Sequence, residues 1–185
     1  RDGKAPAVYQ NPEKFFERTF LTKNLADLSA EVVRRLSGIK VETSSVFNMT
    51  TQFGGGKTHA LTLLYHLAKG GSAAGSWKGV QSVVTKANVD KVPKAKTAVF
   101  VGTEFDSITG RGGNDGTPLR KTPWGEIAFQ LGGEKAFKFV EEHEKQISAP
   151  SPDIIRKFLP EKEPALILVD ELMNYISRNR KSGLA

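Results

Sequence analysis

Two short stretches of the sequence carry residue types that could act together on a phosphate group. The first is a run of glycines followed by a lysine and a threonine, Gly54-Gly55-Gly56-Lys57-Thr58. Glycines let the backbone curl so that several N–H groups face one anion, and the lysine and hydroxyl suit phosphate and Mg²⁺. The second stretch is the acidic pair Asp170-Glu171, which directly follows an apolar run. Together they predict a site that binds and cleaves a nucleoside triphosphate.

The residues that flank the glycine run predict how it is positioned. A short strand-like stretch at 45–50 precedes it, and a pattern typical of an amphipathic helix begins at Lys57. The N-terminus of a helix offers unpaired N–H groups and a partial positive charge, so it suits an anion. The expected nucleotide-binding residues are Phe53, Gly54, Gly55, Gly56, Lys57, Thr58 and His59.

The glycine run departs at one position from the usual phosphate-binding pattern, G-x-x-x-x-G-K-S/T. Thr51 stands where the first glycine of that pattern would be. Thr51 must leave the strand without the backbone freedom of glycine, so we expect the entry to the loop to differ in detail. The alternative interpretation is a flexible loop with a chance Gly-Lys-Thr, but the flanking strand and helix patterns favour a phosphate-binding loop.

The acidic pair has a predicted role for each carboxylate. The apolar stretch 165–169 predicts a buried strand, which would place Asp170 at the carboxyl edge of the sheet, where ligands bind in such folds. We expect Asp170, with Thr58, to hold Mg²⁺, and Glu171 to activate the attacking water. The alternative is that a helix N-terminus has attracted two acids through its dipole.

The order of the predicted elements indicates the fold class. Residues 97–103 predict another buried strand, and strands that alternate with helices are typical of an α/β fold with a parallel sheet and flanking helices. Adjacent acids after a strand favour the P-loop NTPases that use an additional catalytic glutamate. In those enzymes a further strand follows later in the sequence and lies between the P-loop strand and the strand before the acids.

The sequence begins at Arg1 and ends soon after the acidic pair, so we expect part of a longer protein. Residues 1–40 are interpreted as an N-terminal arm with helices, and residues 41–185 as a partial P-loop core. The sensor, arginine-finger and lid residues of such a core are expected outside this sequence.

The composition limits the classes of protein that fit. There is no cysteine, which excludes disulfides, thiolate zinc sites and a cysteine nucleophile, and the three histidines are scattered. No apolar run reaches the roughly 20 residues that span a bilayer, so a cytoplasmic protein without membrane association is expected. The sequence has 27 Lys and Arg and 20 Asp and Glu, and the resulting net charge of +7 is compatible with a polyanionic partner.

Five segments of the sequence together resemble a known family. They are Asn11–Thr22, Thr50–His59, Phe100–Thr103, Thr122–Ala128 and Leu168–Leu172. This combination resembles a prokaryotic family of predicted AAA+ superfamily ATPases, called domain of unknown function 499, over most of residues 8–180. The resemblance implies the amino-terminal part of a large ATPase. Because genes of this family often neighbour DNA methyltransferase genes in presumed phage-defence islands, it also implies DNA or a DNA methyltransferase-type partner.

The first hypothesis for function is therefore Mg²⁺-dependent binding and hydrolysis of ATP. Lys57 and Glu171 are the expected catalytic residues. One alternative is a nucleotide-gated switch or scaffold that hydrolyses little, and another is a nucleic-acid binding module. The sequence leaves open the choice between ATP and GTP and whether the protein forms a homo-oligomer.

Overall fold

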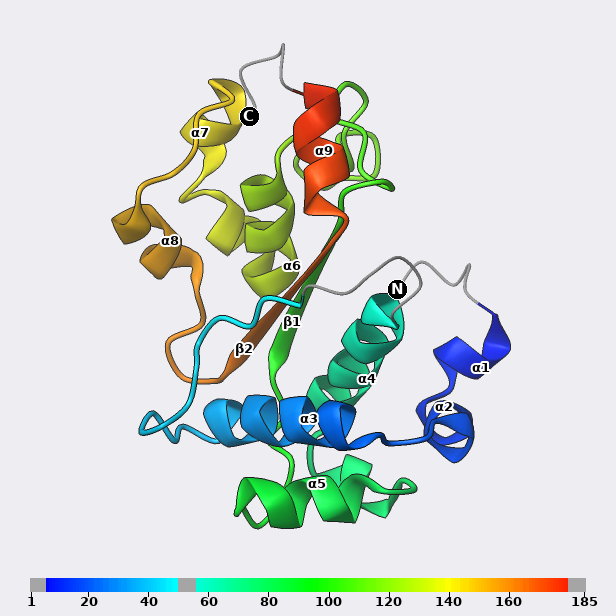
Figure 1. The fold of residues 1–185 in the computed structure, drawn as a ribbon. Coiled ribbons are helices and arrows are strands. Elements are labelled where there is room, and N and C mark those ends of the chain that lie inside the picture. The colour runs from blue at the N-terminus through cyan, green and yellow to red at the C-terminus, as the bar shows by residue number, and fades with distance from the viewer. Residues whose placement is uncertain (1–5, 50–55, 180–185) are drawn as a thin grey trace. The chain divides into compact units, whose positions relative to one another are not determined.

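The computed structural model describes residues 6–49 and 56–179 of the chain (Figure 1). The chain forms two compact units, Arg1–Ala95 and Lys96–Ala185. The described part of the first unit is helical, whereas the second contains a small parallel sheet with helices.

Short helices make up the first unit, and the sequence explains where several of them begin. The elements are α1 (Ala7–Gln10), α2 (Pro12–Arg18), α3 (Lys23–Leu36), α4 (Lys57–Gly70), the 3₁₀ helix η1 (Gly71–Ser76) and α5 (Val80–Ala87). Asn11 caps α2 by accepting a hydrogen bond from the backbone of Lys14, and Thr22 caps α3 through Leu25. The apolar faces of these helices supply a core that includes Phe16, Leu63, Leu67 and Val83.

The strand predicted at 45–50 is not present where the structure can be described. Residues 45–49 form no strand, and Thr50 lies outside the described residues. A strand requires the backbone of a neighbour to complete its hydrogen bonds, and among the described residues only two strands pair with each other. Among the described residues no strand pairs with this stretch, and the side chain of Val46 is 78% exposed.

The second unit contains both strands that the sequence predicted, and they are parallel, as expected for this fold class. Its elements are β1 (Lys96–Val101), α6 (Pro123–Phe137), α7 (Glu141–Lys145), α8 (Pro152–Phe158), β2 (Ala165–Asp170) and α9 (Leu172–Asn179). β1 and β2 are parallel, with Lys96 opposite Ala165 and Val101 opposite Asp170. This register brings the residues that follow both strands to the same edge of the sheet.

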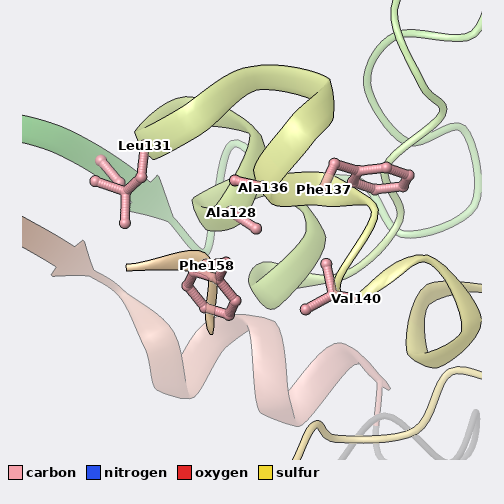
Figure 2. Packing of buried hydrophobic residues seen from close by; sticks show 7 residues of the cluster. Ala128, Leu131, Ala136, Phe137, Val140 and Phe158 are labelled. Carbon is pink, nitrogen blue, oxygen red and sulfur yellow. The ribbon is translucent and has the colours of Figure 1, made fainter. Parts of the chain in front are cut away.

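α6 and α8 build an apolar core against β1. Buried side chains of α6, among them Ala128 and Leu131, cluster with Phe158 of α8 (Figure 2). Ala98 of β1 belongs to the same cluster. α6 bends at Gly132-Gly133, where Gly133 adopts a left-handed φ of 62°, which glycine reaches without steric cost.

The two strands are covered unequally. The side-chain amide of Gln130 on α6 bonds both backbone groups of Val99, at 2.8 and 2.9 Å, as a neighbouring strand would. β2 has less cover, because α6 packs on β1, and Ile167 and Val169 are each 39% exposed. The expectation that β2 is fully buried is therefore wrong.

A buried ion-pair network holds the glycine-rich loop between β1 and α6. Glu126 of α6 is 1% exposed and lies 2.9 Å from the guanidinium of Arg120 and 3.4 Å from that of Arg111. The two arginines also form an antiparallel backbone bridge. Breaking such a buried ion pair would leave an uncompensated buried charge, which is strongly destabilising. The network therefore opposes movement of the loop.

Candidate functional site

The glycine-lysine-threonine motif opens α4 as predicted. Gly56 adopts a left-handed backbone with φ 78°, a conformation that glycine reaches without steric cost, and its carbonyl accepts the first hydrogen bond of the helix from Ala60 at 2.9 Å. Lys57 is half-buried and Thr58 is exposed. Phe53, Gly54 and Gly55 lie outside the described residues.

The start of α4 is chemically suited to an anion. Its first turn holds no acidic side chain, and Gly56 at the cap position has no side chain that could bond the amides. By contrast, α2 and α6 begin with Asn11 and Thr122, whose side chains accept bonds from their own helix amides. Helix amides and the helix dipole together favour a phosphate at such a position.

His59 is engaged by α2 within the first unit. Its ring stacks on Phe15 with centroids 4.6 Å apart, and its Nε2 lies 3.1 Å from the hydroxyl of Thr19. The Thr19 hydroxyl donates its one hydrogen to the Phe15 carbonyl at 2.7 Å, so it must accept from His59. Nε2 of His59 therefore carries the proton, and Nδ1 is the ring nitrogen left for another partner.

The acidic pair lies at the carboxyl edge of the parallel sheet, as the sequence predicted. Asp170 is the last residue of β2, and its carbonyl accepts a hydrogen bond from Gly102 at 2.8 Å. The carboxylate of Asp170 accepts from the backbone N–H of Glu171 at 3.0 Å. Glu171 has a positive φ of 52°, which places its backbone in the left-handed region between β2 and α9.

Gly102, which follows β1, permits the close approach of Glu171. A Cβ atom at position 102 would overlap the carbonyl oxygen of Glu171 and would lie 3.1 Å from the Cβ of Tyr175. The guanidinium of Arg178 on α9 donates to the Gly102 carbonyl and, at 3.2 Å, to that of Phe105. The turn after β1 and the start of α9 are thus held against each other.

The side chain of Glu171 has a partner on α9. The amide of Asn174 donates to Oε2 of Glu171, and the backbone N–H of Asn174 donates to the Glu171 carbonyl at 3.1 Å. The next residue of α9, Tyr175, is 2% exposed. Burial, together with the charge of Glu144, raises the pKa of its phenol to about 12. The phenol therefore stays neutral at physiological pH.

The predicted site residues fall into two local groups. Gly56, Lys57, Thr58 and His59 lie together at the start of α4 in the first unit. Asp170 and Glu171 lie together after β2 in the second unit.

Sequence reasoning missed two residues that contact Glu171, namely Gly102 and Asn174. The spacing of three residues between Glu171 and Asn174 is one at which side chains at the start of a helix meet, so that contact had a signal in the sequence. The role of Gly102 had none, because it arises from pairing between distant strands.

The residues proposed for Mg²⁺ supply the ligand type that this ion prefers. Thr58 offers a hydroxyl and Asp170 a carboxylate, and Mg²⁺ takes oxygen ligands, usually one or two from protein with the rest from water and phosphate. Among residues 6–49 and 56–179, no group of three or more acidic or histidine side chains is placed to hold a metal.

These features define a mixed α/β protein with a small parallel sheet, a Gly-Lys-Thr helix start and an acidic pair at the sheet edge. The family model of the DUF499 N-terminal domain matches residues 1–185, and the chain belongs to this family. None of the curated proteins matches the chain, and no solved structure does. In the part of the chain that the structure describes, every helix is too short or too polar to cross a membrane.

Proposed function

We propose that this chain binds ATP with Mg²⁺ and hydrolyses it, as the motor or switch part of a larger P-loop ATPase of the AAA+ type. The observation that carries the proposal is the start of α4, where a left-handed Gly56 leads directly into Lys57 and Thr58 at an amide-rich helix end free of acidic side chains. Such an end attracts phosphate through both its N–H groups and its dipole.

Each residue has a defined task in the proposed reaction. Lys57 and the helix amides neutralise charge on the β- and γ-phosphates, and Thr58 and Asp170 would bind Mg²⁺. When bound, Mg²⁺ supplies charge neutralisation at the phosphate oxygens. Glu171 accepts a proton from the water that attacks the γ-phosphorus in line with the leaving β-phosphate oxygen.

The acidic pair supports hydrolysis over nucleotide binding alone. Asp170 ends β2 and Glu171 follows in a fixed backbone conformation, so two carboxylates stand at the sheet edge where ligands bind in α/β folds. DNA or a DNA methyltransferase-type partner as the target of the motor is part of the proposal through family resemblance.

A titration of Mg-ATP into the protein tests the binding step. Wild-type protein should bind saturably, whereas Lys57→Ala should lose measurable binding, because the lysine supplies the positive charge that phosphate requires. Lys69→Ala is the matched control, since Lys69 lies exposed in the last turn of the same helix. Equal binding by wild type and Lys57→Ala would contradict the proposed phosphate site.

A further inference from the structure

The side chain of Asn174 is the only one that the structure shows hydrogen-bonded to the Glu171 carboxylate among the described residues. We propose that Asn174 is a positioning residue for Glu171, which holds the carboxylate in the orientation that accepts a proton from the attacking water. This inference rests on the proposed hydrolysis and adds a residue to it.

The backbone of Glu171 is fixed from two sides. Its carbonyl fits against Gly102, where a Cβ atom would collide with it, and accepts hydrogen bonds from the N–H groups of Asn174 at 3.1 Å and Tyr175 at 3.4 Å. The left-handed φ of 52° is uncommon for a residue with a side chain and persists where surrounding contacts impose it. The direction in which the Glu171 side chain leaves the backbone is thereby set.

A fixed backbone does not by itself fix the carboxylate. Glu171 is exposed, and a glutamate side chain retains three rotatable bonds, so its oxygens could occupy many positions. A general base must come within about 2.6–3.2 Å of the proton donor. The bond from the Asn174 amide to Oε2 selects one orientation and offers Oε1 to a water.

Asn174 is itself held in place. It lies in the first turn of α9, and Arg178 on the same helix bonds the carbonyls of Gly102 and Phe105. Tyr175, its neighbour, is buried in a cluster with Phe100 and Phe105. The amide therefore stands on an element anchored to β1 and to the turn that follows it.

A purely structural role for this contact makes a different prediction. Asn174 and Glu171 are both exposed, and a hydrogen bond between exposed side chains contributes little to folding. A structural contact would leave turnover unchanged when removed. A positioning contact would lower kcat while leaving nucleotide affinity and the unfolding midpoint unchanged.

Steady-state ATP turnover of the full-length protein distinguishes these roles. Asn174→Ala is expected to lower kcat about tenfold, because a misplaced base loses catalytic power, with KM and the Kd for Mg-ATP within about twofold of wild type. Asn174→Asp should fall at least as far, since it places a second carboxylate beside Glu171. Asn174→Gln, which keeps an amide donor, should recover part of the rate.

Met173→Ala is the matched control, because Met173 is 65% exposed and precedes Asn174 on the same helix. It should turn over ATP like wild type. Wild-type turnover together with an unchanged rate in Asn174→Ala would overturn the positioning role alone. A wild-type protein that does not hydrolyse ATP would overturn the proposed hydrolysis and this inference together.

Discussion

Among single residues, Lys57 and Glu171 affect the proposed reaction at different steps. Lys57 contributes charge before and during the reaction, so its loss is expected to remove binding. Glu171 accepts a proton only as the water attacks. Because this interaction exists in the transition state, Glu171 should matter for turnover and little for affinity.

Glu171→Gln is therefore expected to bind Mg-ATP like wild type while kcat falls by about 10²-fold or more, since the amide cannot accept the proton. Equilibrium titration and steady-state turnover on the same preparation measure the two effects. Glu161→Gln is the control, because Glu161 is an exposed acid in the loop before β2. Unchanged turnover in Glu171→Gln would remove Glu171 from the mechanism. A wild type that fills with nucleotide but barely turns over would favour the nucleotide-gated switch.

Among the elements, the junction of β1, β2 and α9 determines where the acidic pair lies. Gly102 pairs with Asp170 through its N–H, and the carbonyl of Glu171 occupies the space that a side chain at 102 would need. Because Gly102 has no Cβ atom, the turn after β1 can pack against Glu171, the residue that follows β2.

Gly102→Ala is expected to destabilise the protein by about 1–3 kcal/mol, the usual cost of forcing extra atoms into a packed site, and to lower ATP turnover by displacing Glu171. Gly75→Ala is the control, because a Cβ at position 75 of η1 meets no atom within 4 Å. Urea denaturation and steady-state kinetics measure both effects. A Gly102→Ala protein with wild-type stability and rate would show that this close approach is not required.

On the scale of the whole molecule, the two units contain buried groups that titrate with opposite signs. Burial lowers the pKa of His66 from 6.5 in the first unit, an effect opposed by the hydrogen bond from its Nε2 to the Tyr9 carbonyl at 2.9 Å. In the second unit burial raises the pKa of Glu144, an effect opposed by the hydrogen bond that Thr122 donates to it. Lower pH therefore disfavours folding through His66 and favours it through Glu144.

The free energy of unfolding of the first unit is expected to fall as the pH drops through 6.5, because the unfolded chain then binds a proton at His66 that the folded unit does not. The loss should continue down to the folded-state pKa and then level off. The two tryptophans, Trp77 and Trp124, lie in different units, so a Trp124→Phe protein reports the first unit by Trp77 fluorescence. Urea midpoints between pH 8 and pH 5 measure the slope. His66→Gln should flatten that slope, and an equally steep slope in this variant would assign the effect to another group.

The sequence by itself determined the local features of this protein. Helix starts at Asn11 and Thr122, the break at Gly132-Gly133 and the helix that opens at Lys57 all depend on residues within a few positions of one another. The same holds for the acidic pair at the end of β2, because apolar runs of this length with acids behind them are specified by neighbouring residues.

Only the tertiary structure decided the contacts between distant segments. The pairing of β1 with β2, the Gln130 amide on Val99 and the fit of Glu171 against Gly102 join residues at least 31 positions apart. The stretch 45–49 also depends on distant partners. Its apolar residues indicated a strand, but no described strand pairs with it, and it forms none. A strand exists only where another backbone completes its hydrogen bonds, and a side chain is held only where a partner from elsewhere in the chain reaches it.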